Sequence, residues 1–185
     1  MEQTVVQLKT EKELKIFMDP LRQRLLRTME IAAKPLTAKK LADKMEITPS
    51  AAKHHLTQLE SIGVVEKDHT EQIHGITAQF YRAADVEVRI GMETPVHRRE
   101  KVLLAENLVM NVFSGFVKRV MEQDTPAEQP PFLGDLSTGV LHLTQAQADE
   151  LYATIKRFTA ENARAKGDTL PIEYALVAYR TEVDS

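Results

Sequence analysis

The sequence contains no cysteine among its 185 residues. This absence excludes disulfide bonds, thiolate zinc sites and catalytic cysteine nucleophiles. Long apolar runs are also missing, since no stretch approaches the about 20 residues needed to cross a bilayer. The N-terminal residues MEQTVVQLKTEKELK do not follow the basic, apolar and small order of a signal peptide. We therefore expect a cytoplasmic protein.

Motifs of several common enzyme classes are absent too. The sequence has no glycine-rich phosphate loop, no G-x-S-x-G elbow and no H-E-x-x-H zinc motif. Its Ser, His and Asp residues show no recognisable catalytic spacing. We expect no enzymatic activity, no catalytic residues and no cofactor.

A strong excess of either charge is likewise lacking, because the net charge is −3. Residues 1–85 carry 13 Lys/Arg against 12 Asp/Glu, and residues 86–185 carry 11 against 15. Neither half is basic enough to bind polyanions indiscriminately. Any binding of nucleic acid must therefore come from a local patch.

Residues 11–85 show the pattern of several helices followed by a hairpin. A capping side chain directly before proline marks a helix start, and it occurs at Asp19-Pro20, Thr48-Pro49 and Thr94-Pro95. With Thr37 as a further cap, the signals predict helices at about 11–18, 20–33, 38–46 and 49–62, the last closed by Gly63. VVEKD and ITAQFYRAA then predict two strands around the polar turn HTEQIHG.

Residues 86–185 predict a smaller α+β region. VEVRIGM alternates with the period of a strand, a long helix is expected at about 95–123, and the Pro-rich segment 124–135 is expected to be a linker. A strand–helix–strand unit is predicted over 139–181. Its parts are GVLHL, a helix over 145–165 with a capping box at Thr144 and Gln147, and IEYALVAYR. The whole chain is thus expected to have an α+β fold with domains at 11–85 and 86–185.

The long helix has a broad aliphatic seam at spacings of three and four. Two copies would bury such a seam by knobs-into-holes packing, which predicts a homodimer; the alternative is a core helix within one chain. The residues expected at the dimer contact are Val102, Val109, Val112, Phe116 and Val120.

The helix at 49–62 has a buried stripe and an opposite polar face. At 100° per residue, Ala52, Leu56, Leu59 and Ile62 fall on the stripe. The remaining first turns are small, polar and free of carboxylates, which suits a helix entering the major groove. The candidate base-reading residues are Ser50, Ala51, Lys53, His54 and Thr57. The alternative is that this is an ordinary solvent-exposed helix face without a binding function.

The preceding helix would face the DNA backbone. Leu41, Ala42 and Met45 point inward, and the short connection EITP gives helix-turn-helix spacing. Side chains and N–H groups at the helix starts could hold phosphates. The candidate phosphate-binding residues are Thr37, Lys39, Lys40 and Thr48.

Several pieces of residues 11–85 together resemble the ArsR-type winged helix-turn-helix transcription regulators. These pieces are MDPLRQRLL, LTAKKLADKMEIT, the run SAAKHHLTQLESIGVV and FYR. The resemblance implies a homodimer on an inverted repeat in promoter DNA, usually a repressor released by a signal. By motif position Ser50, Ala51, Lys53 and His54 would read bases, and His55 would lie beside the core.

The sequence departs from the metal-sensing members of that family. Cysteine sites cannot exist, and His97 with Glu100 supply two ligands where zinc normally takes three or four. The polar hairpin tip also contains His and acidic residues, but contact with DNA phosphates is the stronger interpretation there. We expect no metal site. The wing residues expected near DNA are His69, Gln72 and His74.

Two further functions stay open. A winged helix can serve as a protein-interaction module, which predicts weak DNA binding without sequence preference. A ligand or metal sensor would still act through DNA, with an unidentified small-molecule effector bound in residues 86–185. The expected partners are double-stranded DNA and a second copy of the chain.

Overall fold

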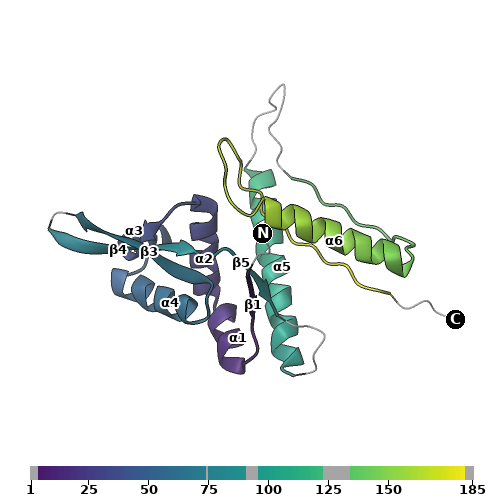
Figure 1. Cartoon of the computed structure of the whole chain (residues 1–185), viewed down its shortest axis with the longest axis horizontal. Helices are drawn as coiled ribbons and strands as arrows, with labels where there is room; N and C mark the ends of the chain where they lie inside the picture. Colours follow the sequence, from purple (N-terminus) through teal and green to yellow (C-terminus); the bar gives the residue numbers. More distant parts are fainter. Residues whose placement is uncertain (1–3, 74, 91–95, 123–133, 182–185) are drawn as a thin grey trace.

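The computed structural model describes residues 4–73, 75–90, 96–122 and 134–181. Four helices precede a β-hairpin, and two longer helices follow it (Figure 1). The helices are α1 (Glu11–Met18), α2 (Pro20–Ala32), α3 (Ala38–Met45), α4 (Pro49–Ser61), α5 (Arg98–Met121) and α6 (Gln145–Glu161). The strands are β1 (Thr4–Gln7), β2 (Leu36–Thr37), β3 (Val65–Ile73), β4 (Ile76–Ala83) and β5 (Val86–Arg89).

The helix starts follow the capping signals of the sequence. The Asp19 carboxylate accepts from the backbone N–H of Arg22, with Pro20 in the first turn of α2. Thr144 and Gln147 form the expected capping box at α6. Gly63 closes α4 at φ +76°, a left-handed conformation that costs glycine little, and its N–H donates to the Glu60 carbonyl.

Two small sheets hold the chain around these helices. One is antiparallel in the order β2-β4-β3, and the other pairs β1 with β5 in parallel. The first sheet continues the hairpin back to the start of α3, because Thr37 of β2 pairs with Phe80 of β4. The second sheet was not expected from the sequence, which gave no prediction for residues 4–7.

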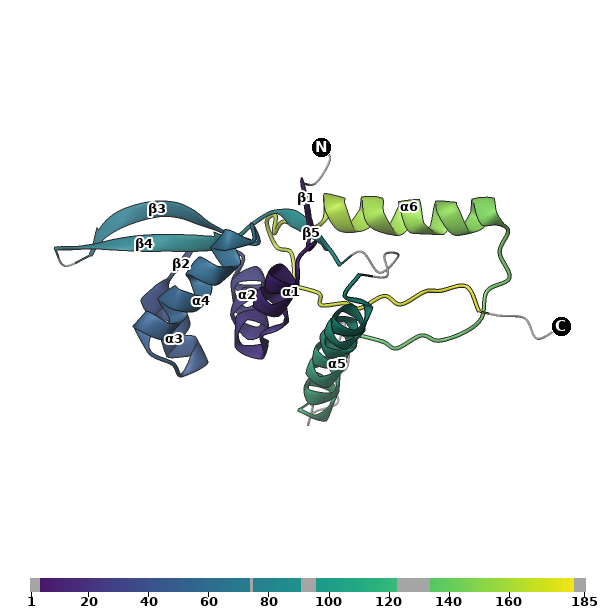
Figure 2. The same ribbon diagram turned by 90° about the horizontal axis from the view of Figure 1, so that it is seen from below.

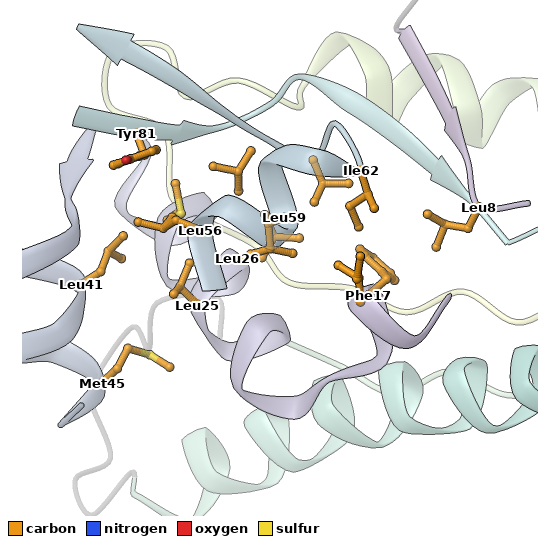
Figure 3. Close-up of a cluster of buried hydrophobic side chains, with 14 of the residues drawn as sticks. Leu8, Phe17, Leu25, Leu26, Leu41, Met45, Leu56, Leu59, Ile62 and Tyr81 are labelled. Atoms are coloured by element: carbon orange, nitrogen blue, oxygen red, sulfur yellow. The ribbon is translucent and has the colours of Figure 1, made fainter. Parts of the chain in front are cut away.

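The core lies among α1 to α4 and under the hairpin (Figure 3). The expected inner stripes of α3 and α4 are confirmed, since Leu41, Leu56 and Leu59 have no exposed surface. Each leucine buried in this way contributes about 1.5–3 kcal/mol from its removal from water. The core thereby fixes which faces of α3 and α4 remain outside.

Helix α5 has two apolar faces. Leu104 is buried and Leu108 packs against the core on one face. The other face includes the expected dimer residues, of which Val102 and Val120 are exposed while Val109, Val112 and Phe116 are half-buried. Leu103, Met110, Phe113 and Val117 widen this exposed face. One chain therefore leaves much of the α5 seam in water.

The start of α5 differs from the prediction of a helix at about 95–123. The helix begins at Arg98, and His97 before it has a left-handed backbone (φ 54°) and makes no side-chain cap. Thr94 and Pro95, the expected start, lie outside the described residues.

The two strands predicted at 139–143 and 172–180 are also not formed in this chain. Both segments are without regular structure, and α6 between them ends at Glu161 rather than at 165. A strand needs a neighbour to complete its backbone hydrogen bonds. No backbone hydrogen bond joins the two described segments, so neither supplies the other with a ladder.

The C-terminal region, residues 134–181, is joined to the N-terminal part by ion pairs. The Arg27 guanidinium of α2 donates from Nε and Nη2 to the Glu173 carboxylate at 2.5 and 2.6 Å. This pair lies over Gly115 of α5, where an added Cβ would stand 3.2 Å from Glu173 Oε2. Arg164 pairs with Asp85 at 2.5 Å.

Within the described residues no helix is long and apolar enough to cross a membrane.

The Glu30 carboxyl, which interacts with the charges of Arg27 and Glu173, has a raised pKa. The Glu30 side chain is exposed by its surface area, but desolvation by surrounding atoms, and secondarily the Glu173 charge, raises its pKa to about 7, while the Arg27 charge opposes the rise. Because the folded state binds this proton more tightly than the unfolded state, the group stabilises the fold at low pH. This contribution to the free energy of unfolding is lost as the pH rises through about 7. We expect the free energy of unfolding to fall from pH 5 to pH 8. Because the residue retains exposed surface, the change should be small.

Chemical denaturation at several pH values measures this effect. The Glu30→Gln variant should lose this component of the pH dependence and be more stable than the parent at pH 8. Glu106→Gln, an exposed carboxyl on α5, is the matched control. If Glu30→Gln and the parent change in parallel over this range, the assignment to Glu30 is wrong.

Candidate nucleic-acid interface

The turn between α3 and α4 fixes the angle of the two helices. Glu46 has a left-handed backbone (φ 57°), and its N–H donates to the Ala42 carbonyl to close α3. Two residues later the Thr48 hydroxyl oxygen accepts from the Ala51 N–H at 3.2 Å, with Pro49 at the first position of α4. These local bonds set one geometry for the pair.

The outward face of α4 collects the candidate base-reading side chains. Ser50, Lys53, His54 and Thr57 are exposed, and Ala51 is half-buried. No acidic residue lies in the first turn. The Thr57 hydroxyl donates to the Lys53 carbonyl at 3.0 Å, and its oxygen can still accept. The face thus offers a cation, an imidazole and two hydroxyls without a carboxylate among them.

His55 lies apart from this face. It is half-buried, and its Nδ1 is buried without a hydrogen-bond partner in the described part of the chain. Burial lowers the pKa of His55, an effect that the Asp19 charge opposes. The imidazole is therefore neutral near pH 7, and it contacts the His54 ring edge-on at 5.6 Å between centroids.

The N-terminal end of α3 presents cations beside a buried cap. Thr37 is buried, and its hydroxyl oxygen accepts from the Lys40 N–H at 3.2 Å. Lys39, Lys40 and Lys44 are exposed on the outer side of α3. The hydroxyl oxygens of Thr37 and Thr48 already cap helices. An anion near either residue would therefore be bound by backbone N–H groups and by neighbouring lysines.

The Phe80 ring of the hairpin lies near side chains of both β3 and α3. A bulge between Lys67 and Thr70 places Asp68 and His69 opposite the single residue Phe80. The His69 ring stacks on Phe80 at 4.3 Å between centroids. The Lys40 ammonium lies 5.9 Å from the centre of the same ring. Phe80 therefore gathers two of the candidate DNA-binding side chains.

Neighbouring cations partly neutralise the carboxylates of the hairpin. Arg82 pairs with Glu66 at 2.9 Å and with Asp68 at 3.2 Å. Lys67 of the hairpin pairs with Glu60 at the end of α4, at 3.0 Å. Two of the predicted wing residues are exposed: His69, which pairs with Asp68, and Gln72, which donates to Thr77. His74 lies outside the described residues.

The described residues of the hairpin, which exclude His74, do not gather a set of metal ligands. Among the residues that the structure describes, no group of three or more His, Asp or Glu is placed to hold a metal ion. The closest approach is the pair of His69 Nδ1 and Asp68 Oδ2, at 2.5 Å.

Figure 2 shows how these parts lie together. The hairpin extends from the body of the domain, with α3 and α4 together beneath it. The sequence motif FYR includes Phe80 but gave it no part in the interface, and Gln79, which donates to the His69 carbonyl at 2.8 Å, was not singled out. The strand period of ITAQFYRAA was the available signal, but the bulge that brings His69 to Phe80 has no sequence signature here.

Comparison with known families agrees with this geometry. A family model described as a helix-turn-helix domain matches residues 17–68, which span α2, α3, α4 and the start of β3. No curated protein matches the chain. The chain therefore has an N-terminal helix-turn-helix domain, a class of DNA-binding regulatory domain rather than of enzyme. The match supports a DNA-binding regulator.

Proposed function

We propose that the protein is a transcription regulator of the ArsR-type winged helix-turn-helix class, acting as a homodimeric repressor on an inverted-repeat operator. Residues 11–85 form the DNA-binding domain, with β1 and β5 completing its core. Residues 86–185 provide the dimer contact and a place for an effector. The proposed mechanism is occlusion of polymerase by the bound dimer.

The observation that carries the proposal is the outer face of α4. Ser50, Lys53 and His54 stand exposed at the start of the second helix of a helix-turn-helix unit, with no acid in the first turn. Donors at such a helix start can reach the N7 and O6 acceptors of purines in the major groove. Ala51 can contact a thymine methyl, and Thr57 lies one turn further along the same face.

The lysines of α3 and the hairpin complete the proposed surface. Lys39 and Lys40, with the N–H groups near Thr37 and Thr48, would hold phosphates on either side of the groove. The hairpin acts as the wing, where His69 and Gln72 reach the backbone or the minor groove. Lys40 and His69 share the Phe80 ring, so support helix and wing approach the DNA as one surface.

Selection of binding sites from a random duplex pool tests the function. About 0.15 M salt suppresses nonspecific phosphate binding. We expect enrichment of an inverted repeat with half-sites about one helical turn, roughly 34 Å, apart. Failure to enrich any sequence would overturn the proposal and favour a protein-interaction module instead.

The selected site then allows the base-reading residues to be tested. Lys53→Ala and His54→Ala should each weaken binding to the selected site by about 1–3 kcal/mol, the value of one good base contact. Titration by fluorescence anisotropy measures this loss. Lys12→Ala, an exposed lysine on α1, is the control and should bind as the parent does. Unchanged affinity in both α4 variants would remove these residues from base readout.

A further inference from the structure

The bulge in β3 brings two neighbouring side chains of the hairpin together. In a regular strand, successive side chains point to opposite faces of the sheet, so adjacent side chains lie apart. At the bulge, Asp68 Oδ2 lies 2.5 Å from Nδ1 of His69. Both residues stand opposite Phe80, because the pairing register shifts between Lys67 and Thr70. The bulge thus makes a carboxylate–imidazole pair that a regular strand would keep apart.

The His69 ring is restrained on several sides and remains accessible. It stacks on Phe80 with 4.3 Å between the ring centroids and 12° between the ring planes. Phe80 is 7% exposed and belongs to β4, so it gives the imidazole a fixed support. Gln79 donates to the His69 carbonyl at 2.8 Å, which holds the backbone of the bulge. The His69 side chain is nevertheless 48% exposed, so an outside group can reach it.

The Asp68 carboxylate determines which nitrogen of His69 carries the hydrogen. A carboxylate only accepts hydrogen bonds, so the hydrogen lies on Nδ1. The other ring nitrogen, Nε2, makes no hydrogen bond to any residue that the structure describes. In the neutral ring Nε2 is an acceptor, and in the imidazolium it is a donor. Nε2 therefore presents a lone pair to an outside group until the ring takes up a proton.

The charges around this ring come from three elements and balance when the ring is neutral. Arg82 of β4 pairs with Asp68 at 3.2 Å and with Glu66, also of β3, at 2.9 Å. On α3, the Lys40 ammonium lies 5.9 Å from the centre of the aromatic ring on which His69 stacks. Two cations thus stand against two carboxylates. A proton on His69 gives this group of side chains a net positive charge.

We propose that His69 binds a phosphate of the DNA backbone only in its protonated form: Asp68 holds the ring against Phe80, and the Nε2–H of the imidazolium donates to a phosphate oxygen. The ionised phosphate oxygens accept hydrogen bonds, so a neutral ring in this tautomer would meet them with a lone pair. Binding therefore draws a proton from the buffer onto each wing, and no covalent bond to DNA forms. The inference rests on the proposed function, to which it adds a dependence of DNA affinity on pH.

Proton uptake on binding distinguishes this role from a structural one. Calorimetric titration of the selected duplex, in two buffers of different ionisation enthalpy at pH 7.5, gives the number of protons taken up. A histidine is ordinarily neutral at this pH, whereas an imidazolium bound to phosphate keeps its proton. We expect the parent to take up about half a proton per wing more than His69→Gln. Titrating groups that both proteins share, such as Glu30 and His54, cancel in this difference.

The affinity for the same duplex gives a second readout. Between pH 6.5 and pH 8, the parent should lose about fivefold more affinity per wing than His69→Gln does. His69→Arg is charged at every pH, and its planar group can also stack on Phe80. This variant should bind about as tightly as the parent at pH 6.5 and more tightly at pH 8.

Asp68→Asn tests the positioning role of the carboxylate. The amide oxygen can still accept from His69 Nδ1, but the charge that stabilises the imidazolium is gone, so this variant should take up fewer protons than the parent at pH 7.5. Glu71→Gln removes the same charge from an exposed position three residues further along β3 and is the matched control. His142→Gln, which removes an exposed histidine outside the hairpin, is the second control. Both controls should take up as many protons as the parent.

The outcomes separate this proposal from the one on which it rests. Sequence-specific binding with a lower proton uptake in His69→Gln supports the phosphate site. Sequence-specific binding in which His69→Gln takes up as many protons as the parent overturns the phosphate site and keeps the proposed function. The same pH dependence in His69→Arg as in the parent also overturns it, and unchanged uptake in Asp68→Asn overturns the role of Asp68. If the site selection enriches no sequence, both proposals fail.

Discussion

Phe113→Glu is expected to convert the protein to a monomer and to weaken its binding to an inverted repeat by about 100- to 10,000-fold, the range lost when two linked sites act singly. Phe113 lies on the exposed apolar face of α5. A carboxylate there would be buried without a partner in the proposed dimer, which costs several kcal/mol. Sedimentation gives the oligomeric state, and titration of a full site against a half-site gives the affinity.

The control for this variant is Asn111→Glu, which adds the same charge at an exposed position on the same helix. On a helical wheel Asn111 falls about 160° from Phe113. This variant should remain dimeric and bind the full site as the parent does. Dimers that persist in Phe113→Glu would place the dimer contact elsewhere in the chain.

Leu56→Ala is expected to lower the free energy of unfolding by about 3–5 kcal/mol, the loss typical of a leucine removed from a closely packed core. The Leu56 side chain has no exposed surface. Because domains of this size are stable by about 5–15 kcal/mol in total, this loss is a large share of the stability, and the variant should unfold at a lower temperature than the parent. Denaturation followed by circular dichroism measures the change.

The neighbouring substitution Thr57→Ala provides the comparison for Leu56→Ala. Thr57 is one residue further along α4 and is exposed, so its removal should change stability by no more than about 0.5 kcal/mol. If Thr57 contacts DNA, this variant loses affinity while its stability stays unchanged. A Leu56→Ala protein as stable as the parent would contradict the packing described for α4.

The sequence predicted the helix-turn-helix unit well because its determinants are local. Capping threonines, proline at the first helical position and a 3.6-residue apolar period all lie within the helices that they specify. Thr48, Pro49, Leu56 and Gly63 are examples, and each has its expected place in the structure. The exposed positions of Lys53 and His54 follow from the same wheel.

Features that depend on distant partners were not predicted. Strand β1 is four residues long, and it pairs with Val86 to Arg89, some eighty positions away. The arrangement of Lys40 and His69 around Phe80 depends on a bulge that shifts the hairpin register. The segments 139–143 and 172–180 have the composition of strands, but composition does not supply a neighbour, and in one chain neither has one. Periodicity indicates which face is apolar and says little about what will cover it.

The Arg27–Glu173 pair has a consequence for how the two halves of the molecule move. Both side chains are partly exposed, so the pair stabilises the docked arrangement by about 1 kcal/mol or less. The core around Leu14, Leu25 and Leu56 does not depend on it. Breaking this pair therefore costs little free energy, and the core of the N-terminal part includes no residue of the C-terminal segment. A molecule that binds the segment only when it is released from α2 would be coupled to DNA binding if DNA prefers one position of α2. DNA would then change the affinity for that molecule by the same factor by which the molecule changes the affinity for DNA.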